Sequence, residues 1–187
     1  MTLTLVLPER DGVVIDLAYA TAANFTGAPI YRRPLCYLHA DALARLSRAV
    51  ALAAPLGLKL KILDAFRPAE AQWVLWNHLP DPDYIADPRR GSPHGRGVAV
   101  DLTLTCAATG ADLDMGTGFD DMRPLSWHAN IEVSTEAQRN RLLLLGLMSA
   151  AGWDFYSREW WHYQLFDARA RYPVLTDSVL PQGLMAE

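Results

Sequence analysis

Residues 92–104, with the sequence SPHGRGVAVDLTL, constrain the fold of this chain most. A run of apolar and β-branched residues predicts a strand over 98–104, yet one carboxylate interrupts it. In an unbroken strand His94 and Asp101 would face opposite sides, because they are an odd number of positions apart. Gly95 and Gly97 remove this constraint, so a turn through His-Gly-Arg-Gly can bring His94 and Asp101 together.

A second cluster, REWWHYQL at residues 158–165, places a histidine in the middle of another predicted strand. A buried histidine needs hydrogen-bond partners or a metal. Zinc binds imidazole nitrogen and carboxylate oxygen, and a catalytic zinc has three protein ligands and a water. We therefore predict one zinc held by His94, Asp101 and His162. Glu159 is placed to take a proton from the metal's water.

Other interpretations of these residues stay open at this point. Taken alone, His94 and Asp101 also fit a loop histidine and a carboxylate that caps a turn. His128, in a Ser-Trp-His loop, competes with His162 as the third ligand. Trp160 and Trp161 are most simply core or pocket-wall residues.

Two further charged residues are candidates for the same site. Arg67, in LDAFRP, lies at a predicted strand-to-helix junction, where the helix dipole disfavours a cation by up to about 1 kcal/mol. Beside a metal it could stabilise an oxyanion, and the alternative is an ion pair with Asp64 or Glu70. Asp120 follows glycines and a phenylalanine, and could anchor a substrate ammonium or simply lie in a solvated loop.

The pattern along the chain predicts an α+β fold, with helices packed on a mainly antiparallel sheet and a single domain over residues 1–187. Thr135 and Gln138 fit a capping box, Gly152 a helix stop, and Pro68 the first residue of a helix. The expected strands cover 3–6, 12–18, 58–64, 98–104 and 160–166, and the expected helices 40–54, 68–79 and 135–151. Residues 80–97 and 107–133 are long connections, which are usually functional or flexible.

Composition excludes several classes of protein. The formal charge of −4, without a basic run, makes nucleic acid an unlikely partner. No apolar run approaches the roughly 18 residues that span a membrane. The first residues do not resemble a secretory signal, so we expect a soluble, cytoplasmic protein. Cys36 and Cys106 are too few for a disulfide framework, and neither has the context that activates a cysteine nucleophile.

Together, the motifs S-x-H-x-x-G-x-A-x-D, DAFRP and EWWHY resemble the D-alanyl-D-alanine dipeptidases, a family of zinc peptidases. Residues 24–39, 114–120 and 137–144 resemble the family as well, so the likeness covers most of the chain. It implies zinc ligation by His94, Asp101 and His162, with Glu159 as catalytic base and Arg67 as stabiliser of the carbonyl oxygen. It also implies that Asp120 and Ser92 lie around the termini of the dipeptide.

The resemblance further implies hydrolysis of a small D,D-dipeptide to two D-alanines, and the fold of zinc D,D-carboxypeptidases and the hedgehog signalling domain. The chain departs from the family pattern at Gly95, where serine is common, and at Pro93, where a polar or basic residue is common. Two alternatives remain: a zinc D,D-carboxypeptidase or cell-wall endopeptidase on the same fold, and a zinc-binding domain without catalysis.

Overall fold

Strand β4 (Leu58–Asp64) and strand β5 (Ala99–Cys106) form the centre of the molecule. In the computed structural model, which describes residues 2–185, these two strands pair antiparallel along most of their length. Alternation along β4 buries Leu60 and Ile62 completely, while Lys59 and Lys61 are more exposed. The predicted strand at 58–64 is therefore confirmed.

The main sheet has five strands in the order β2 (Val14–Ile15), β4, β5, β7 (His162–Gln164) and β6 (Asp154–Phe155). Strands β2 and β4 are parallel, and the other three pairings are antiparallel. A second, two-stranded antiparallel sheet joins β1 (Leu3–Leu5) to β3 (Tyr37–His39). The described part of the chain is thus one α+β domain with a mainly antiparallel sheet, as expected.

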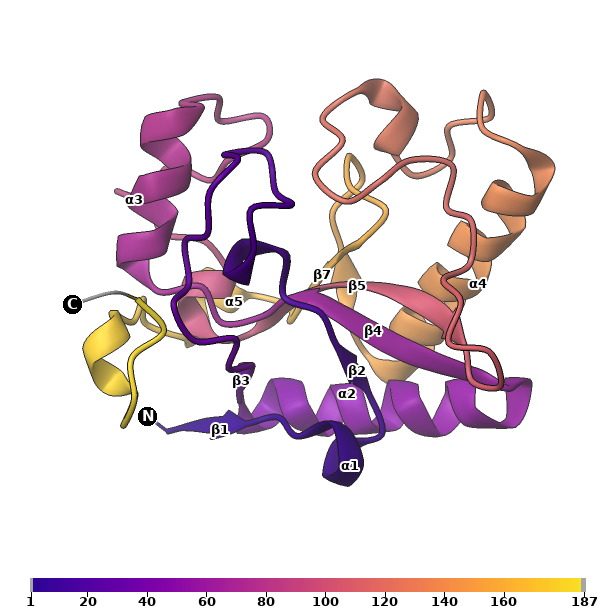
Figure 1. Cartoon of the computed structure of the whole chain (residues 1–187), viewed down its shortest axis with the longest axis horizontal. Helices are drawn as coiled ribbons and strands as arrows, with labels where there is room; N and C mark the ends of the chain where they lie inside the picture. The colour runs from indigo at the N-terminus through magenta and orange to yellow at the C-terminus, as the bar shows by residue number, and fades with distance from the viewer. Residues whose placement is uncertain (1, 186–187) are drawn as a thin grey trace.

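The two longest helices are α2 (Ala40–Ala53) and α4 (Thr135–Ala151), and they contact each other as well as the sheet. Figure 1 shows α2 along one side of the sheet, with α3 (Ala69–His78) and the long connections on the other. Two helices of four residues complete the set, α1 (Pro8–Asp11) and α5 (Ala168–Arg171). Short 3-10 turns occur at Ala18–Ala20, Ala54–Leu56, His94–Arg96, Pro124–Ser126 and Asp177–Val179.

Strand β5 separates the hydrophobic core from the polar side of the sheet. Val100, Leu102 and Leu104 alternate along it and are completely buried in the core cluster. Asp101 points the other way, and the strand register places it opposite His162 of β7. The strand pairing itself therefore brings Asp101 and His162 together.

Helix α4 has the predicted bounds but a different capping residue, and α3 begins one residue later than predicted. Ser134, not Thr135, caps α4: its backbone is extended, and its Oγ accepts a 3.0 Å hydrogen bond from the Ala137 backbone N–H. The predicted capping box is therefore wrong. Pro68 likewise precedes α3 as its cap instead of beginning it. Gly152 ends α4 with a φ of 93°, as predicted.

Strand β1 is one residue shorter than predicted, and two other strands are much shorter. Strand β7 begins at His162, so this histidine lies at the start of the strand and not in its middle, because Trp160 turns away to bond the Ser126 carbonyl. At 12–18 only Val14–Ile15 pairs as a strand, and a 3-10 turn follows. Strands β3 and β6 were not predicted, since each is only two or three residues long.

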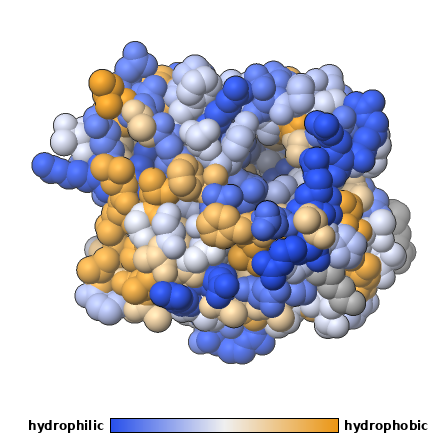
Figure 2. All heavy atoms as spheres, turned by 180° about the vertical axis from the view of Figure 1, so that it is seen from behind, coloured by the Kyte–Doolittle hydropathy of each residue, from blue (hydrophilic) through white to orange (hydrophobic). Residues whose placement is uncertain are grey.

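Within residues 2–185, none of the helices is both long enough and apolar enough to span a bilayer. Several large apolar side chains remain exposed, among them Leu56, Ile131 and Leu142. On the face shown in Figure 2, hydrophobic and hydrophilic residues are interspersed.

Candidate metal centre and active site

One cavity of about 260 Å³ is lined by all the residues that the sequence predicts for the site. Its lining includes Arg67, Ser92, His94, Asp101, Asp120, Glu159 and His162. These residues come from five separate segments of the chain, so only the folded topology places them together.

His94 reaches the cavity from a 3-10 turn that ends at Gly97, whose φ of 68° favours glycine. A Cβ at Gly97 would also lie 2.4 Å from a side-chain carbon of Leu3. The ring of His94 is fixed by its Nδ1–H, which donates to the Ala65 carbonyl oxygen at 2.7 Å. Its Nε2 is therefore the atom that faces Asp101, 3.3 Å from Oδ2.

His162 faces the same point from β7. Its Nδ1 lies 3.0 Å from Asp101 Oδ1 and 3.1 Å from His94 Nε2. Its Nε2–H donates to Oε1 of Gln164 at 3.1 Å, two residues along the same strand. Both rings thus have one nitrogen oriented by an oxygen acceptor outside the cluster and the other directed into it.

This donor set fits a divalent metal. The ligand atoms of His94, Asp101 and His162 lie within 4.8 Å of one another, and all three residues are buried. The unprotonated ring nitrogens of His94 and His162 face each other beside the Asp101 carboxylate. These electron-rich atoms repel one another unless a cation lies between them. Two imidazoles and one carboxylate match the three protein ligands of a catalytic zinc site.

Arg67 is held on several sides, with its guanidinium directed at the cluster. Its Nε donates to Asp64 Oδ2 at 2.8 Å, and its Nη1 to Gln72 Oε1 at 3.2 Å. Nη2 lies 3.5 Å from Asp101 Oδ2. The ion pair with Asp64 considered from the sequence is therefore present, whereas Glu70 accepts from the backbone of Asp177 instead. The pair compensates the buried charge and orients it toward the cavity.

Glu159 lies beside the cluster, at the edge of the cavity. A turn places it there, since its backbone N–H bonds the Tyr156 carbonyl and its own carbonyl accepts from the His162 N–H. Its Oε2 is 3.9 Å from His162 Nδ1, next to the three donor atoms. Burial raises the pKa of Glu159 to about 8, and Asp101 and Asp120 add to this effect while His162 opposes it. A carboxyl with such a pKa suits proton transfer near neutral pH.

Asp120 and Ser92 line the same cavity. Asp120 has a φ of 58°, unusual for a residue with a side chain, and its carboxylate accepts from the Tyr19 hydroxyl at 3.0 Å. Burial, with help from Asp101, raises the pKa of Asp120 to about 7. Ser92 Oγ accepts the Gly95 backbone N–H at 3.1 Å, which leaves its hydroxyl proton for another acceptor.

The competing candidates lie elsewhere. The His128 ring packs edge-on against Phe155 and Tyr163, and burial lowers its pKa to about 4. Cys36 is buried in the core, where desolvation raises the pKa of its thiol, and Cys106 is at the far end of β5. Trp160 and Trp161 are buried as expected, and Trp161 forms part of the cavity wall.

Three supporting residues were not assigned a role from the sequence: Tyr19, Gln72 and Gln164. Gln164 had a usable signal, because a residue two positions from His162 on one strand shares its face. Tyr19 gave none, since it bonds Asp120, which lies 101 positions further along the chain. Gln72 is only five positions from Arg67, but nothing in the sequence singled it out.

A buried two-histidine, one-carboxylate cluster with a carboxyl and a guanidinium at its border has the donor set and the neighbouring charges that suit a one-metal hydrolytic site. Comparison with known proteins agrees. The peptidase M15 family model, described as D-ala-D-ala dipeptidase, matches residues 6–179. The chain belongs to this family of peptidases.

Individual relatives carry the same description. A D-alanyl-D-alanine dipeptidase of Escherichia coli (strain K12) is 45% identical over 175 residues, covering 94% of this chain and 88% of the relative. One of Enterococcus faecium is 36% identical over 176 residues, covering 83% and 87%. One of Streptomyces coelicolor is 34% identical over 185 residues, again covering 83% and 87%.

Proposed function

We propose that this protein hydrolyses D-alanyl-D-alanine to two molecules of D-alanine, using one zinc ion per chain. The observation that carries the proposal is the convergence of the three-donor cluster, Glu159 and Arg67 in one small cavity. At about 260 Å³ this cavity is smaller than most ligand pockets, which suits a dipeptide.

His94 Nε2, Asp101 and His162 Nδ1 would hold the metal. Zinc, when bound, acts as a Lewis acid and lowers the pKa of a coordinated water towards about 7. Glu159 takes the proton of the attacking water and later delivers it to the leaving amine. Arg67, already fixed by Asp64 and Gln72, donates to the carbonyl oxygen as negative charge develops there.

Substrate recognition is assigned to the charged ends of the dipeptide. Two methyl groups contribute little binding energy, so specificity for so small a substrate must come from its ammonium and carboxylate groups. Asp120, held by Tyr19, binds the ammonium when ionised, and the Ser92 hydroxyl donates to the far end of the substrate.

Three further expectations belong to the same proposal. The zinc dipeptidase domain would extend over residues 1–187 as one unit. Its fold would be the one shared by zinc D,D-carboxypeptidases and the hedgehog signalling domain. Its substrate, a small dipeptide derived from peptidoglycan chemistry, would be its principal partner.

The test is release of D-alanine by zinc-loaded protein from three substrates: D-alanyl-D-alanine, L-alanyl-L-alanine and a peptidoglycan pentapeptide. Cleavage of the D,D-dipeptide alone supports the proposal. Preference for the pentapeptide would move the protein to the carboxypeptidases. No cleavage of any of the three by folded, zinc-loaded protein would refute the proposal.

A further inference from the structure

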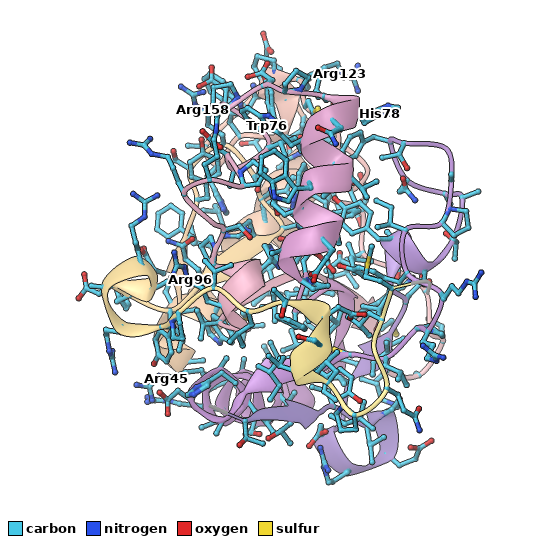
Figure 3. All side chains as sticks on the ribbon, turned by 90° about the vertical axis from the view of Figure 1, so that its left-hand side faces the viewer. Arg45, Trp76, His78, Arg96, Arg123 and Arg158 are labelled. Carbon is cyan, nitrogen blue, oxygen red and sulfur yellow. The ribbon has the colours of Figure 1, made fainter. Side chains whose placement is uncertain are left out.

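Two loops contribute to the lining of the cavity, and we call the place where they meet its mouth. Residues 81–86 follow α3, and residues 156–158 connect β6 to Glu159. Pro82, Asp83, Tyr84, Ile85 and Ala86 of the first loop and Tyr156 of the second loop line the cavity, whereas Arg158 lies next to the lining residues without being one of them. Figure 3 shows Arg158 at the same end of the molecule as His78, the last residue of α3.

Asp83 joins the two loops. Its Oδ1 lies 2.9 Å from Nη1 of Arg158, and its carbonyl oxygen accepts from the Tyr156 hydroxyl at 3.3 Å. Both contacts run across the mouth, between residues more than 70 positions apart in the sequence. We call the Asp83–Arg158 ion pair the clasp.

Each loop is also anchored on its own side. The Ala86 carbonyl accepts from Gln72 Nε2 at 2.8 Å, and the same side chain bonds Arg67. Ile85 is buried and its backbone N–H bonds the Asp81 carbonyl. On the other side, the guanidinium of Arg158 lies 5.3 Å from the centre of the Trp127 ring. The clasp therefore joins two supported loops rather than two free ends.

We infer that the clasp limits the length of the substrate, an inference that rests on the proposed function. The side chain of Asp83 is 65% exposed and that of Arg158 is 35% exposed, so the pair is weak and opens easily. A bound dipeptide fits inside the cavity with the clasp closed. The additional residues of a longer peptide must extend out through the mouth, so the clasp has to stay open while that peptide is bound. Because so exposed an ion pair is weak, its loss should raise the kcat/KM for longer peptides, relative to that for the dipeptide, by only about fivefold.

Charge reversal tests this inference. The variants Asp83→Arg and Arg158→Asp place like charges across the mouth, and the double variant restores opposite charges. The readout is the kcat/KM for tri-D-alanine divided by that for D-alanyl-D-alanine. We expect each single variant to raise this ratio about fivefold or more and the double variant to return it towards the wild-type value. The inference would be overturned if the single variants had the wild-type ratio, or if the ratio of the double variant were as high as that of the single variants.

Asp112→Arg is the matched control, because Asp112 also forms an ion pair, 2.9 Å from Lys61 Nζ, but lies outside this cavity. Its ratio should stay at the wild-type value. An Asp112→Arg ratio raised as much as that of Asp83→Arg would mean that the effect reflects total charge, and would count against the clasp.

Hydrogen exchange separates the clasp from the catalytic proposal. Without substrate, the Ile85 amide should exchange several-fold faster in either single variant than in the wild type, and slow again in the double variant. If this holds while the wild type leaves D-alanyl-D-alanine intact, the clasp stands and the proposed function fails. If exchange is the same in all four proteins, the clasp fails whatever the substrate is.

Discussion

The floor of the cavity and its rim are built from opposite kinds of contact. The floor consists of His94, Asp101 and His162, which are buried and oriented by the backbone, by strand pairing and by Gln164. The rim consists of residues 81–86 and 156–158, joined by the exposed Asp83–Arg158 pair. Catalysis needs metal-ligand atoms that are fixed in place before the substrate binds, whereas substrate entry needs contacts that break easily. The two regions should therefore respond to mutation on different scales.

The largest effect is expected from removal of a floor ligand. Asp101→Ala should abolish metal binding at stoichiometric zinc and lower kcat/KM by on the order of 10³-fold or more, because the metal supplies most of the electrophilic catalysis. Zinc content and dipeptide turnover measure both effects. A variant that keeps its zinc and its turnover would remove Asp101 from the site.

Glu159→Gln should lower kcat by about 10²- to 10⁴-fold while the protein still binds one zinc, because the amide keeps the shape of the side chain but cannot accept a proton. Turnover and zinc content are measured on the same sample. Full activity would refute the role of Glu159 as general base, and loss of the metal would show that Glu159 is a ligand instead.

Gln164→Leu should weaken zinc binding by about 10- to 100-fold, since the Nε2–H of His162 loses its acceptor. Gln164→Glu keeps an acceptor and should bind zinc at least as tightly as the wild type. Competition with a chromophoric chelator measures both affinities. Gln138→Leu, on α4 and outside the cavity, is the control and should leave affinity unchanged. Equal affinities in Gln164→Leu and Gln164→Glu would mean that Gln164 does not orient His162.

The smallest of the four effects is a pH dependence. With a pKa of about 7, Asp120 becomes protonated as the pH falls below neutrality and can then no longer pair with the substrate ammonium. Glu159, with a pKa of about 8, is protonated over the same range, so kcat/KM should fall more steeply than tenfold per pH unit below 7. In Asp120→Asn the acid limb of the pH profile should become less steep, because only Glu159 still takes up a proton, and the plateau should drop. Zinc content checked at each pH excludes metal loss, and an unchanged acid limb in the variant would contradict the assignment.

Much of the floor could be predicted from the sequence, because its residues lie in local patterns that carry their own geometry. The glycines after His94 indicated a turn, and the strand at 98–104 placed Asp101 on a defined face. The start of β7 was misplaced because Trp160 and Trp161 look like strand residues, although both lie in a turn and the Trp160 N–H bonds the Ser126 carbonyl.

The rim could not be predicted in the same way. Asp83 and Arg158 are ordinary charged residues in polar segments, and their pairing depends on how α3 and the β6–β7 connection are placed in space. Tyr19 illustrates the same limit, since it contacts Asp120 across 101 positions of the chain. Periodicity and spacing predict local geometry, while such contacts follow only from the packed fold.

The central claim is that the floor is a one-metal catalytic centre, and its most direct test is a crystal structure of zinc-loaded protein with anomalous data at the zinc edge. The account predicts one zinc, at about 2.0–2.2 Å from His94 Nε2, Asp101 and His162 Nδ1, with an open position facing Glu159. Zinc at another place, or zinc closed by a fourth protein ligand, would contradict it.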